Sequence, residues 1–180
     1  MITVIAGSNR KNNQTAIFAE YAYQSLKKSI GDQVNIFDLS ELGPEIIHDA
    51  MYQKDSQSAE VAHIQDTYFI PSDKFWFFVP EYNGSIPGIL KLLIDAISVR
   101  DGKETFGNKK ACITGIASGR AGNLRGMDHL ADILNHMNVA VLPNKQPISS
   151  IYKLLDRDQK LVDEKTMGCL EVQKEAFLSF

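Results

Sequence analysis

Residues 2–15 decide the fold of this chain: Ile2-Thr3-Val4-Ile5-Ala6 is followed by Gly7-Ser8-Asn9-Arg10-Lys11-Asn12-Asn13-Gln14-Thr15. The first run is mostly apolar and predicts a buried strand, and the residues after the polar loop predict a helix from about Asn13 to Ser29. Such a helix offers an anion its free N–H groups and the positive end of its dipole. Ser8 and Thr15 add hydroxyl donors, and Arg10 can hold a phosphate through two hydrogen bonds. We therefore expect an anion site here.

This loop does not match the general nucleotide-binding motifs. No Gly-Lys-Ser or Gly-Lys-Thr follows at the spacing of a P-loop, and the second and third glycines of a dinucleotide-binding fingerprint are missing. A polar loop with an ordinary helix cap is therefore an open alternative.

The composition is that of an ordinary globular domain. Hydrophobic residues make up 44% of the 180 residues, which suits one domain that covers residues 1–180. A net charge of −3 without a dense Lys/Arg patch argues against a nucleic-acid partner. Cys112 and Cys169 form no Cys-x-x-Cys pair, so we expect no disulfide framework and no metal. No apolar run is long enough to span a membrane and no basic leader precedes the first strand, so we expect a cytoplasmic protein with no membrane partner.

Strands and helices alternate along the rest of the chain. The patterns predict four more strands, at Val34–Leu39, Phe75–Val79, Ala111–Ile116 and Val139–Leu142, and four more helices, at Ser58–Tyr68, Ile89–Val99, Met127–Met137 and from a cap at Asp163 to about Leu178. This order predicts an α/β fold with a five-stranded parallel sheet and helices on both faces.

Two segments have a weaker pattern. Ser40–Asp55 shows no clean periodicity, and we expect a long, partly ordered loop that covers a site or contacts a partner subunit. The helix expected at Ser58–Tyr68 has a modest apolar stripe. Its inward positions are predicted to be Ala59 and Ala62, with Val61, Ile64 or Tyr68 beside them.

The segment Ile89–Val99 is apolar nearly all round. A helix of this kind is buried on more than one side, and one sheet cannot cover it fully. We expect part of it to lie in the subunit interface of a homodimer or homotetramer. A deeply buried core helix in a monomer is the alternative.

Two further loops also follow predicted strands. Pro80–Gly88 comes after the third strand and contains Pro87, which suits the first turn of a helix, and the Gly-rich Ala117–Leu124 comes after the fourth. Ligands of open parallel sheets bind beyond the carboxyl ends of the strands, where all three loops should lie.

Taken together, these loops are similar to those of a known family. Gly7-Ser8-Asn9-Arg10, followed by Pro80-Glu81-Tyr82-Asn83-Gly84-Ser85-Ile86-Pro87-Gly88-Ile89-Leu90-Lys91 with Ile94-Asp95, resembles the NAD(P)H-dependent FMN reductase family. That family has a flavodoxin-like, doubly wound fold and includes quinone, azo-dye and chromate reductases. The resemblance reaches to about Leu142 and implies FMN as cofactor, NADPH or NADH as co-substrate and a small-molecule electron acceptor.

The resemblance also implies which residues bind FMN. The phosphate would be bound by Ser8, Arg10, Asn13, Gln14 and Thr15; the isoalloxazine ring would lie along Pro80, Glu81, Tyr82, Asn83 and Gly84; and its pyrimidine side would be closed by Ser118, Gly119 and Arg120, together with Asn123. The chain departs from the family pattern at three places: Asn12-Asn13 stands where a Ser is frequent, Leu92 where an Asn is common, and Gly119-Arg120 where paired glycines are common.

No side chain is predicted to be catalytic. Ser118 lies in Gly-Ile-Ala-Ser-Gly and not in a Gly-x-Ser-x-Gly elbow, and a flavin enzyme needs no nucleophile because its cofactor carries the hydride chemistry. Our hypothesis is a ping-pong cycle from NAD(P)H through FMN to a quinone, azo compound, metal oxyanion or free flavin. A flavodoxin-type electron carrier is one alternative, although Arg10 and the modest net charge favour the enzyme. A sugar- or nucleotide-phosphate-binding domain without flavin is another.

A few residues have two interpretations. Asp132 and His136 are four apart on one predicted helix and are expected to form a solvated ion pair in preference to a metal site. Trp76 is expected in the core, whereas Tyr82, which follows a central strand, is expected to contact the flavin. Arg120 and Arg125 either meet the 2′-phosphate of NADPH or are ordinary surface arginines.

Overall fold

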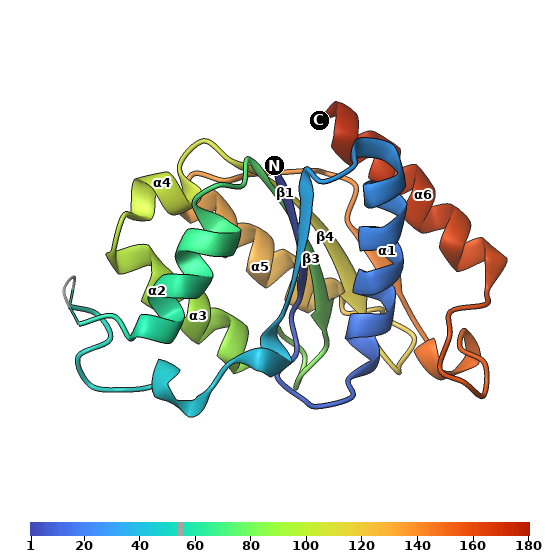
Figure 1. Ribbon diagram of the computed structural model, residues 1–180. Helices are drawn as coiled ribbons and strands as arrows, with labels where there is room; N and C mark the ends of the chain where they lie inside the picture. The colour runs from blue at the N-terminus through green and yellow to red at the C-terminus, as the bar shows by residue number, and fades with distance from the viewer. Residues whose placement is uncertain (54–55) are drawn as a thin grey trace.

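A computed structural model describes residues 1–53 and 56–180 and shows one parallel sheet between two layers of helices (Figure 1). The strands are β1 (Ile2–Ala6), β2 (Val34–Asp38), β3 (Lys74–Pro80), β4 (Lys110–Ile116), β5 (Ala140–Val141) and β6 (Gln146–Ile148). They lie in the order β2-β1-β3-β4-β5, and β6 also pairs with β4. This is the flavodoxin-like order, whose ligand site is the switch point between β1 and β3. The predicted α/β sandwich is thus confirmed.

The fifth position of the sheet is shared by two short strands. β5 pairs with the start of β4 and β6 with its end, so Leu142–Lys145 interrupts the ladder. Pro143 lies in this interruption and has no N–H to donate. In the interrupted part of the ladder, a side chain supplies the hydrogen bonds: Gln173 Nε2 donates to the carbonyl oxygens of Ile113 and Asn144 at 3.0 Å each. The fifth strand predicted at Val139–Leu142 therefore corresponds to β5 alone, and β6 was not predicted.

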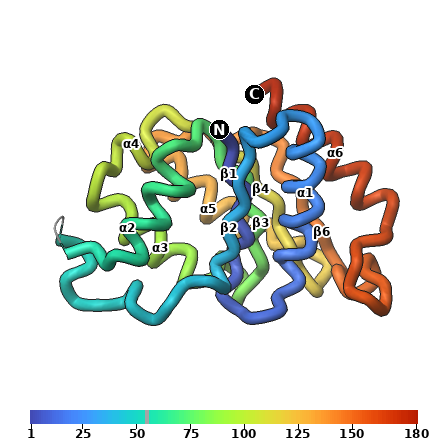
Figure 2. The backbone as a smooth tube through the Cα atoms, viewed as in Figure 1, coloured from blue at the N-terminus to red at the C-terminus, as the bar shows by residue number. Residues whose placement is uncertain are grey.

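The helices cover both faces of the sheet. Their bounds are α1 (Gln14–Ile30), α2 (Ala59–Ile64), α3 (Gly88–Val99), α4 (Gly102–Phe106), α5 (Leu124–His136) and α6 (Glu164–Ser179). Helices α1 and α6 lie on one face, and α2, α3, α4 and α5 lie on the other (Figure 2). The fully buried Trp76 belongs to the core between β3 and the α1–α6 layer, as expected, and its Nε1 donates to Thr114 Oγ1.

Helix ends follow their capping residues. Asn13 caps α1 by accepting a hydrogen bond from Ala16 N at 2.9 Å, and Gly31, with φ of 65°, ends this helix. Asp163 caps α6 by accepting from Thr166 N at 2.8 Å. These two helices therefore begin and end within two residues of their predicted limits.

The helix predicted at Ser58–Tyr68 has a different shape. Helix α2 ends at Ile64 and continues as a wider π turn, Gln65–Phe69, so the inward face shifts. Val61, Ile64, Gln65 and Phe69 are buried, whereas Ala59 is exposed, and the prediction that Ala59 faces inward is wrong. Val61 and Ile64, which are larger and more apolar than Ala59, take the inward positions of α2, and the buried amide of Gln65 continues this face by donating to Ile97 O at 2.9 Å.

The segment Ser40–Asp55 is held by two apolar anchors. Ile46 and Met51 are buried in the core beside α2 and α3. Residues 54 and 55, at the end of the predicted loop, lie outside the described residues.

We predict that Gln173→Met destabilises the protein. The substitution keeps the volume but leaves the buried carbonyl oxygen of Ile113 without its donor and the buried hydroxyl of Thr114 without its acceptor, and each unpaired buried group costs roughly 1–3 kcal/mol. Urea unfolding should show a loss of at least 2 kcal/mol, within that range. The control is Gln24→Met on the exposed face of α1, which should change stability by less than about 0.5 kcal/mol. Equal stability of the two variants would contradict this account.

Candidate functional site

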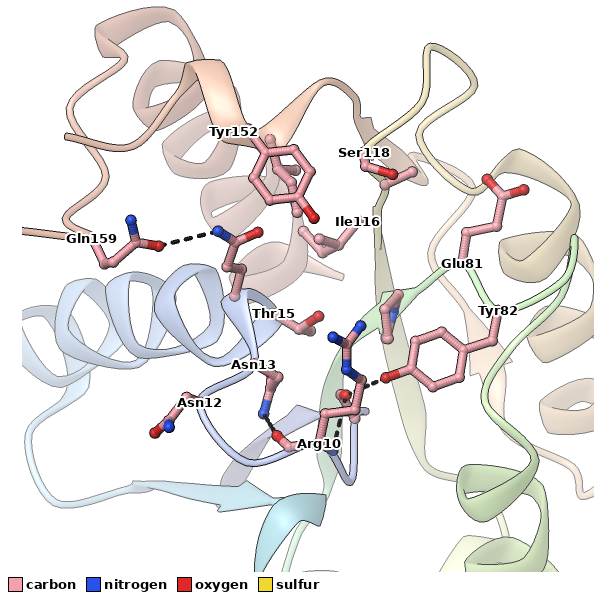
Figure 3. A pocket seen from close by; sticks show the side chains of 15 residues that line it. Arg10, Asn12, Asn13, Thr15, Glu81, Tyr82, Ile116, Ser118, Tyr152 and Gln159 are labelled. Carbon is pink, nitrogen blue, oxygen red and sulfur yellow. Dashed lines mark hydrogen bonds between the residues drawn. The ribbon is translucent and has the colours of Figure 1, made fainter. Parts of the chain in front are cut away.

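Three loops meet where β1, β3 and β4 end. These strands are neighbours in the sheet, so the residues after Ala6, Pro80 and Ile116 converge on one pocket of about 300 Å³. Figure 3 shows its side chains. The pocket is lined by Ser8, Arg10, Asn12, Asn13, Gln14, Thr15, Pro80, Glu81, Tyr82, Ile116, Ala117, Ser118, Ile151, Tyr152 and Gln159.

The first loop leaves β1 through a residue that must be glycine. Gly7 N donates to Phe78 O at 2.8 Å, and a Cβ on Gly7 would come within 2.9 Å of the same backbone oxygen. A side chain at this position would push β1 and β3 apart. The close contact brings the first loop alongside the residues that follow β3.

The first loop and the start of α1 offer several donors to the pocket. Ser8 and Thr15 are almost completely buried, yet both line the pocket, and the Thr15 hydroxyl points into it (Figure 3). The N–H groups of the first turn of α1 lie beside them. Arg10 is exposed and, among residues 1–53 and 56–180, forms no ion pair with a carboxylate. This donor set fits a phosphate group.

The second loop closes into a tight turn. Asn83 and Gly84 have φ of 53° and 78°, and Tyr82 and Ser85 exchange backbone hydrogen bonds of 3.0 and 3.1 Å. Two successive left-handed residues favour Asn-Gly, which is the sequence found here. The turn places the ring of Tyr82 along the pocket.

Two side-chain contacts hold this turn in place. The Tyr82 hydroxyl lies 2.8 Å from Ser8 Oγ and so joins the second loop to the first. On the other side, Ser85 Oγ lies 2.7 Å from His129 Nδ1 on α5. Tyr82 is thus a wall of the pocket and not part of the core.

The third loop is fastened to β3 by Asn123. This residue is buried, and its Nδ2 donates to Val79 O at 2.9 Å. Its Oδ1 is buried with no partner among the described residues. Because Asn123 does not line the pocket, it supports the loop, and Ala117 and Ser118 are the residues of this loop that line the pocket.

The pocket brings together most of the residues that the resemblance assigned to FMN. Apart from Asn123, thirteen residues were assigned, and nine of the thirteen line the pocket: Ser8, Arg10, Asn13, Gln14, Thr15, Pro80, Glu81, Tyr82 and Ser118. Asn83 and Gly84 form the neighbouring turn, and Gly119 and Arg120 continue the third loop at an exposed position. The described part of Ser40–Asp55 contributes no lining residue.

Six lining residues were not predicted: Asn12, Ile116, Ala117, Ile151, Tyr152 and Gln159. The first three lie within or next to predicted loops, so their neighbours could have indicated them. Ile151, Tyr152 and Gln159 follow β6, where no motif marks a site. They reach the pocket through tertiary contacts alone.

The structure offers little to a metal. No group of three or more His, Cys, Asp or Glu suited to an ion is present within the described ranges. On α5, Asp128 pairs with Lys145 and His129 with Ser85. Burial raises the pKa of the Cys112 thiol well above its usual value, which makes this cysteine unreactive at neutral pH. Among the described helices, none has the length and apolar character needed to cross a membrane.

Fold and site together define a flavodoxin-like protein with a pocket lined by hydrogen-bond donors at the switch point of its sheet. The family model of NADPH-dependent FMN reductases matches residues 1–153, and the chain belongs to this family. FMN is therefore its cofactor and NAD(P)H its co-substrate, and the protein is an oxidoreductase. The donors around Thr15 and Arg10 fit the phosphate of FMN.

The chain is similar to several curated relatives, including two reductases. An NAD(P)H-dependent FMN reductase of Pseudomonas aeruginosa is 35% identical over 106 residues, which are 58% of this chain and 57% of that protein. The match therefore spans little more than half of that relative. A 2-hydroxy-1,4-benzoquinone reductase of a Burkholderia species is 26% identical over 180 residues, which cover 99% of this chain and 94% of that protein.

Solved structures share the fold. The flavoenzyme NAD(P)H:(acceptor) oxidoreductase of Paracoccus denitrificans superposes with a TM-score of 0.76 at 22% identity, over 99% of this chain and 97% of that one. An azoreductase, AzrA, superposes with a TM-score of 0.65 at 17% identity, over 99% of each chain. At these identities the likeness supports the flavodoxin-like fold alone.

We predict that Arg10→Ala weakens FMN binding. The substitution removes a guanidinium that has no carboxylate partner in the described chain, and charge-assisted hydrogen bonds contribute roughly 1.5–3 kcal/mol each, so the Kd should rise at least tenfold. Fluorescence titration of FMN measures this change. Lys11→Ala, in the same loop but outside the pocket, is the matched control and should leave the Kd within about twofold. An unchanged Kd in Arg10→Ala would place the phosphate elsewhere.

Proposed function

We propose that the pocket holds FMN with its phosphate in the first loop and its ring along the second. The observation that carries this proposal is the convergence of Ser8, Thr15, Arg10 and the start of α1 on one pocket. Asn13 and Gln14 complete the phosphate side, and Pro80, Glu81, Tyr82, Asn83 and Gly84 would lie along the ring. Ser118, Gly119 and Arg120 would close the pyrimidine side.

Bound FMN supplies the hydride chemistry, and the protein orients and tunes it. Tyr82 N–H already donates to Ser85 O, and Ser85 N–H to Tyr82 O. The donors that this turn can offer to the ring are therefore the N–H groups of Asn83 and Gly84. Gly84 has no side chain to obstruct a close approach.

We infer that the protein oxidises NAD(P)H and reduces a small acceptor in two half-reactions. The proposed acceptors are a quinone, an azo compound, a metal oxyanion or free flavin, and the benzoquinone reductase among the relatives supports the first of these. In this cycle both substrates would bind at the pocket in turn. The buried, unreactive Cys112 fits the cytoplasmic location that we propose.

The kinetic prediction is a set of parallel double-reciprocal plots. NADPH concentration is varied at several fixed concentrations of a benzoquinone, and the slope should stay constant because the first product leaves before the second substrate binds. The control contains free FMN without protein. Intersecting lines would require both substrates to be bound together and would contradict the proposed cycle.

We also propose that the protein is a homodimer or homotetramer assembled through α3. Leu90, Leu93, Ile94, Ala96 and Ile97 are buried in the core, whereas Ile89 and Leu92 pack against the edge of the same core and stay partly exposed. A second copy would cover this apolar strip.

Leu92→Glu should therefore shift the protein to a monomer. A carboxylate in the middle of an apolar interface loses hydration without gaining a partner, which raises the dissociation constant roughly a hundredfold or more. Light scattering after size exclusion measures the mass, and circular dichroism checks the fold. Val172→Glu on the exposed side of α6 is the control and should keep the native mass. A monomeric native protein would end this proposal.

A further inference from the structure

The segment after β6 forms a wall of the pocket that no sequence motif marks. It runs from Ser150 to Val162 and contributes Ile151, Tyr152 and Gln159 to the lining. The following inference rests on the proposed FMN site and concerns the part of FMN that this wall touches.

The start of the segment is fixed to the third loop. Ser150 N donates to Gly119 O at 3.1 Å, and Ile151 N donates to Ala117 O at 3.3 Å. The backbone of Ser150 adopts the left-handed conformation, with φ of 53°. The chain turns here, and Ile151 is buried in the core beside α1 and α6. The position of the next residue, Tyr152, is therefore set by the core beneath it.

The rest of the segment is a short hairpin whose tip contacts α1. Leu155 pairs with Leu161, and Asp156 Oδ1 accepts from the N–H groups of Asp158 and Lys160 at 2.9 Å each. At the tip, Gln159 Oε1 accepts from Gln14 Nε2 at 3.1 Å. The segment thus connects the third loop to the first turn of α1, beside the proposed phosphate position.

Tyr152 is the side chain that this framework presents to the pocket. Tyr152 lies on the same side of the pocket as Gln159 and Thr15, opposite Glu81 and Tyr82, and its hydroxyl points inward (Figure 3). The residue is 67% exposed, and within the described chain its hydroxyl has no hydrogen-bond partner. Leaving a large ring open to water is unfavourable, and a ligand that covers the ring would recover that free energy.

We propose that Tyr152 is a flavin-binding residue whose ring covers the ribityl–phosphate part of FMN. Because Tyr152 lies on the side of the pocket where α1 starts, we assign it to the ribityl–phosphate part of FMN. The isoalloxazine ring would lie along the loop that contains Tyr82. The hydrogen bond between Gln159 and Gln14 holds the hairpin that contains Tyr152 against α1. Ser150–Val162 therefore acts as a fourth ligand-binding segment.

The test compares Tyr152→Ala, Tyr152→Phe and Val162→Ala with the native protein. Each protein is loaded with FMN, and the release of FMN on dilution is followed by flavin fluorescence, which gives Kd. Tyr152→Ala should raise Kd roughly tenfold because the covering ring is lost, whereas Tyr152→Phe should stay within about threefold because the ring remains. Val162 is exposed in the same hairpin but outside the pocket, so Val162→Ala should leave Kd unchanged.

Three results would overturn this assignment. The first is a Kd for Tyr152→Ala equal to the native value. The second is an equal loss in Tyr152→Phe, which would show that the ring is not a cover. The third is an equal loss in Val162→Ala, which would show a general effect of the hairpin. The native protein separates these results from a failure of the proposed function. If the native protein binds FMN and the bound FMN is reduced by NADPH, the proposed function stands and only the assignment of Tyr152 fails. If the native protein binds no FMN, the proposed function fails as well.

Discussion

The contact between β1 and β3 at Gly7 is the constraint on which the site depends. The N–H group of Gly7 donates a hydrogen bond to Phe78 O at 2.8 Å, and a side chain at position 7 would have no room. This closeness lets the Tyr82 hydroxyl reach Ser8, so the first two loops share one wall. An anion at the start of α1 and a flat ring along the second loop can then belong to one ligand. The switch point of the sheet, where the strand order reverses, thereby becomes a binding site.

The other half of the pocket depends on the divided fifth strand. The ladder is interrupted between β5 and β6, and Gln173 of α6 donates to the carbonyl oxygen of Ile113 on β4. β6 then resumes pairing next to the end of β4, which brings Ser150 and Ile151 against the third loop. The hydrogen bond between Gln173 and β4 thus helps to position the segment that contains Tyr152.

Local signals in the sequence predicted much of this architecture. Apolar runs marked the strands, Asn13, Gly31 and Asp163 marked helix ends, and the two loops after β1 and β3 carried enough specific residues to indicate the family. Which residues bind FMN remains a prediction, although nine of the thirteen line one pocket. Each of these features is encoded by neighbours in the chain.

Features that depend on distant partners escaped prediction. The buried amide of Gln65, at the start of the π turn, donates to Ile97 O of α3, and the inward face of α2 is formed by Val61 and Ile64, whereas Ala59 is exposed. The contact of Gln159 with Gln14 joins residues 145 positions apart. Hydrophobic periodicity contains no information about such pairs. Only the folded chain reveals that a hairpin without a motif lies beside the ligand.

The most direct test of the central claim is the visible spectrum of the purified protein with added FMN, recorded before and after anaerobic addition of NADPH and, separately, NADH. The account predicts a protein-bound flavin spectrum that bleaches with at least one of the two donors. A bound flavin that neither donor reduces would indicate an electron carrier. Failure to bind FMN would mean that the pocket holds a different phosphate ligand, and it would contradict the account.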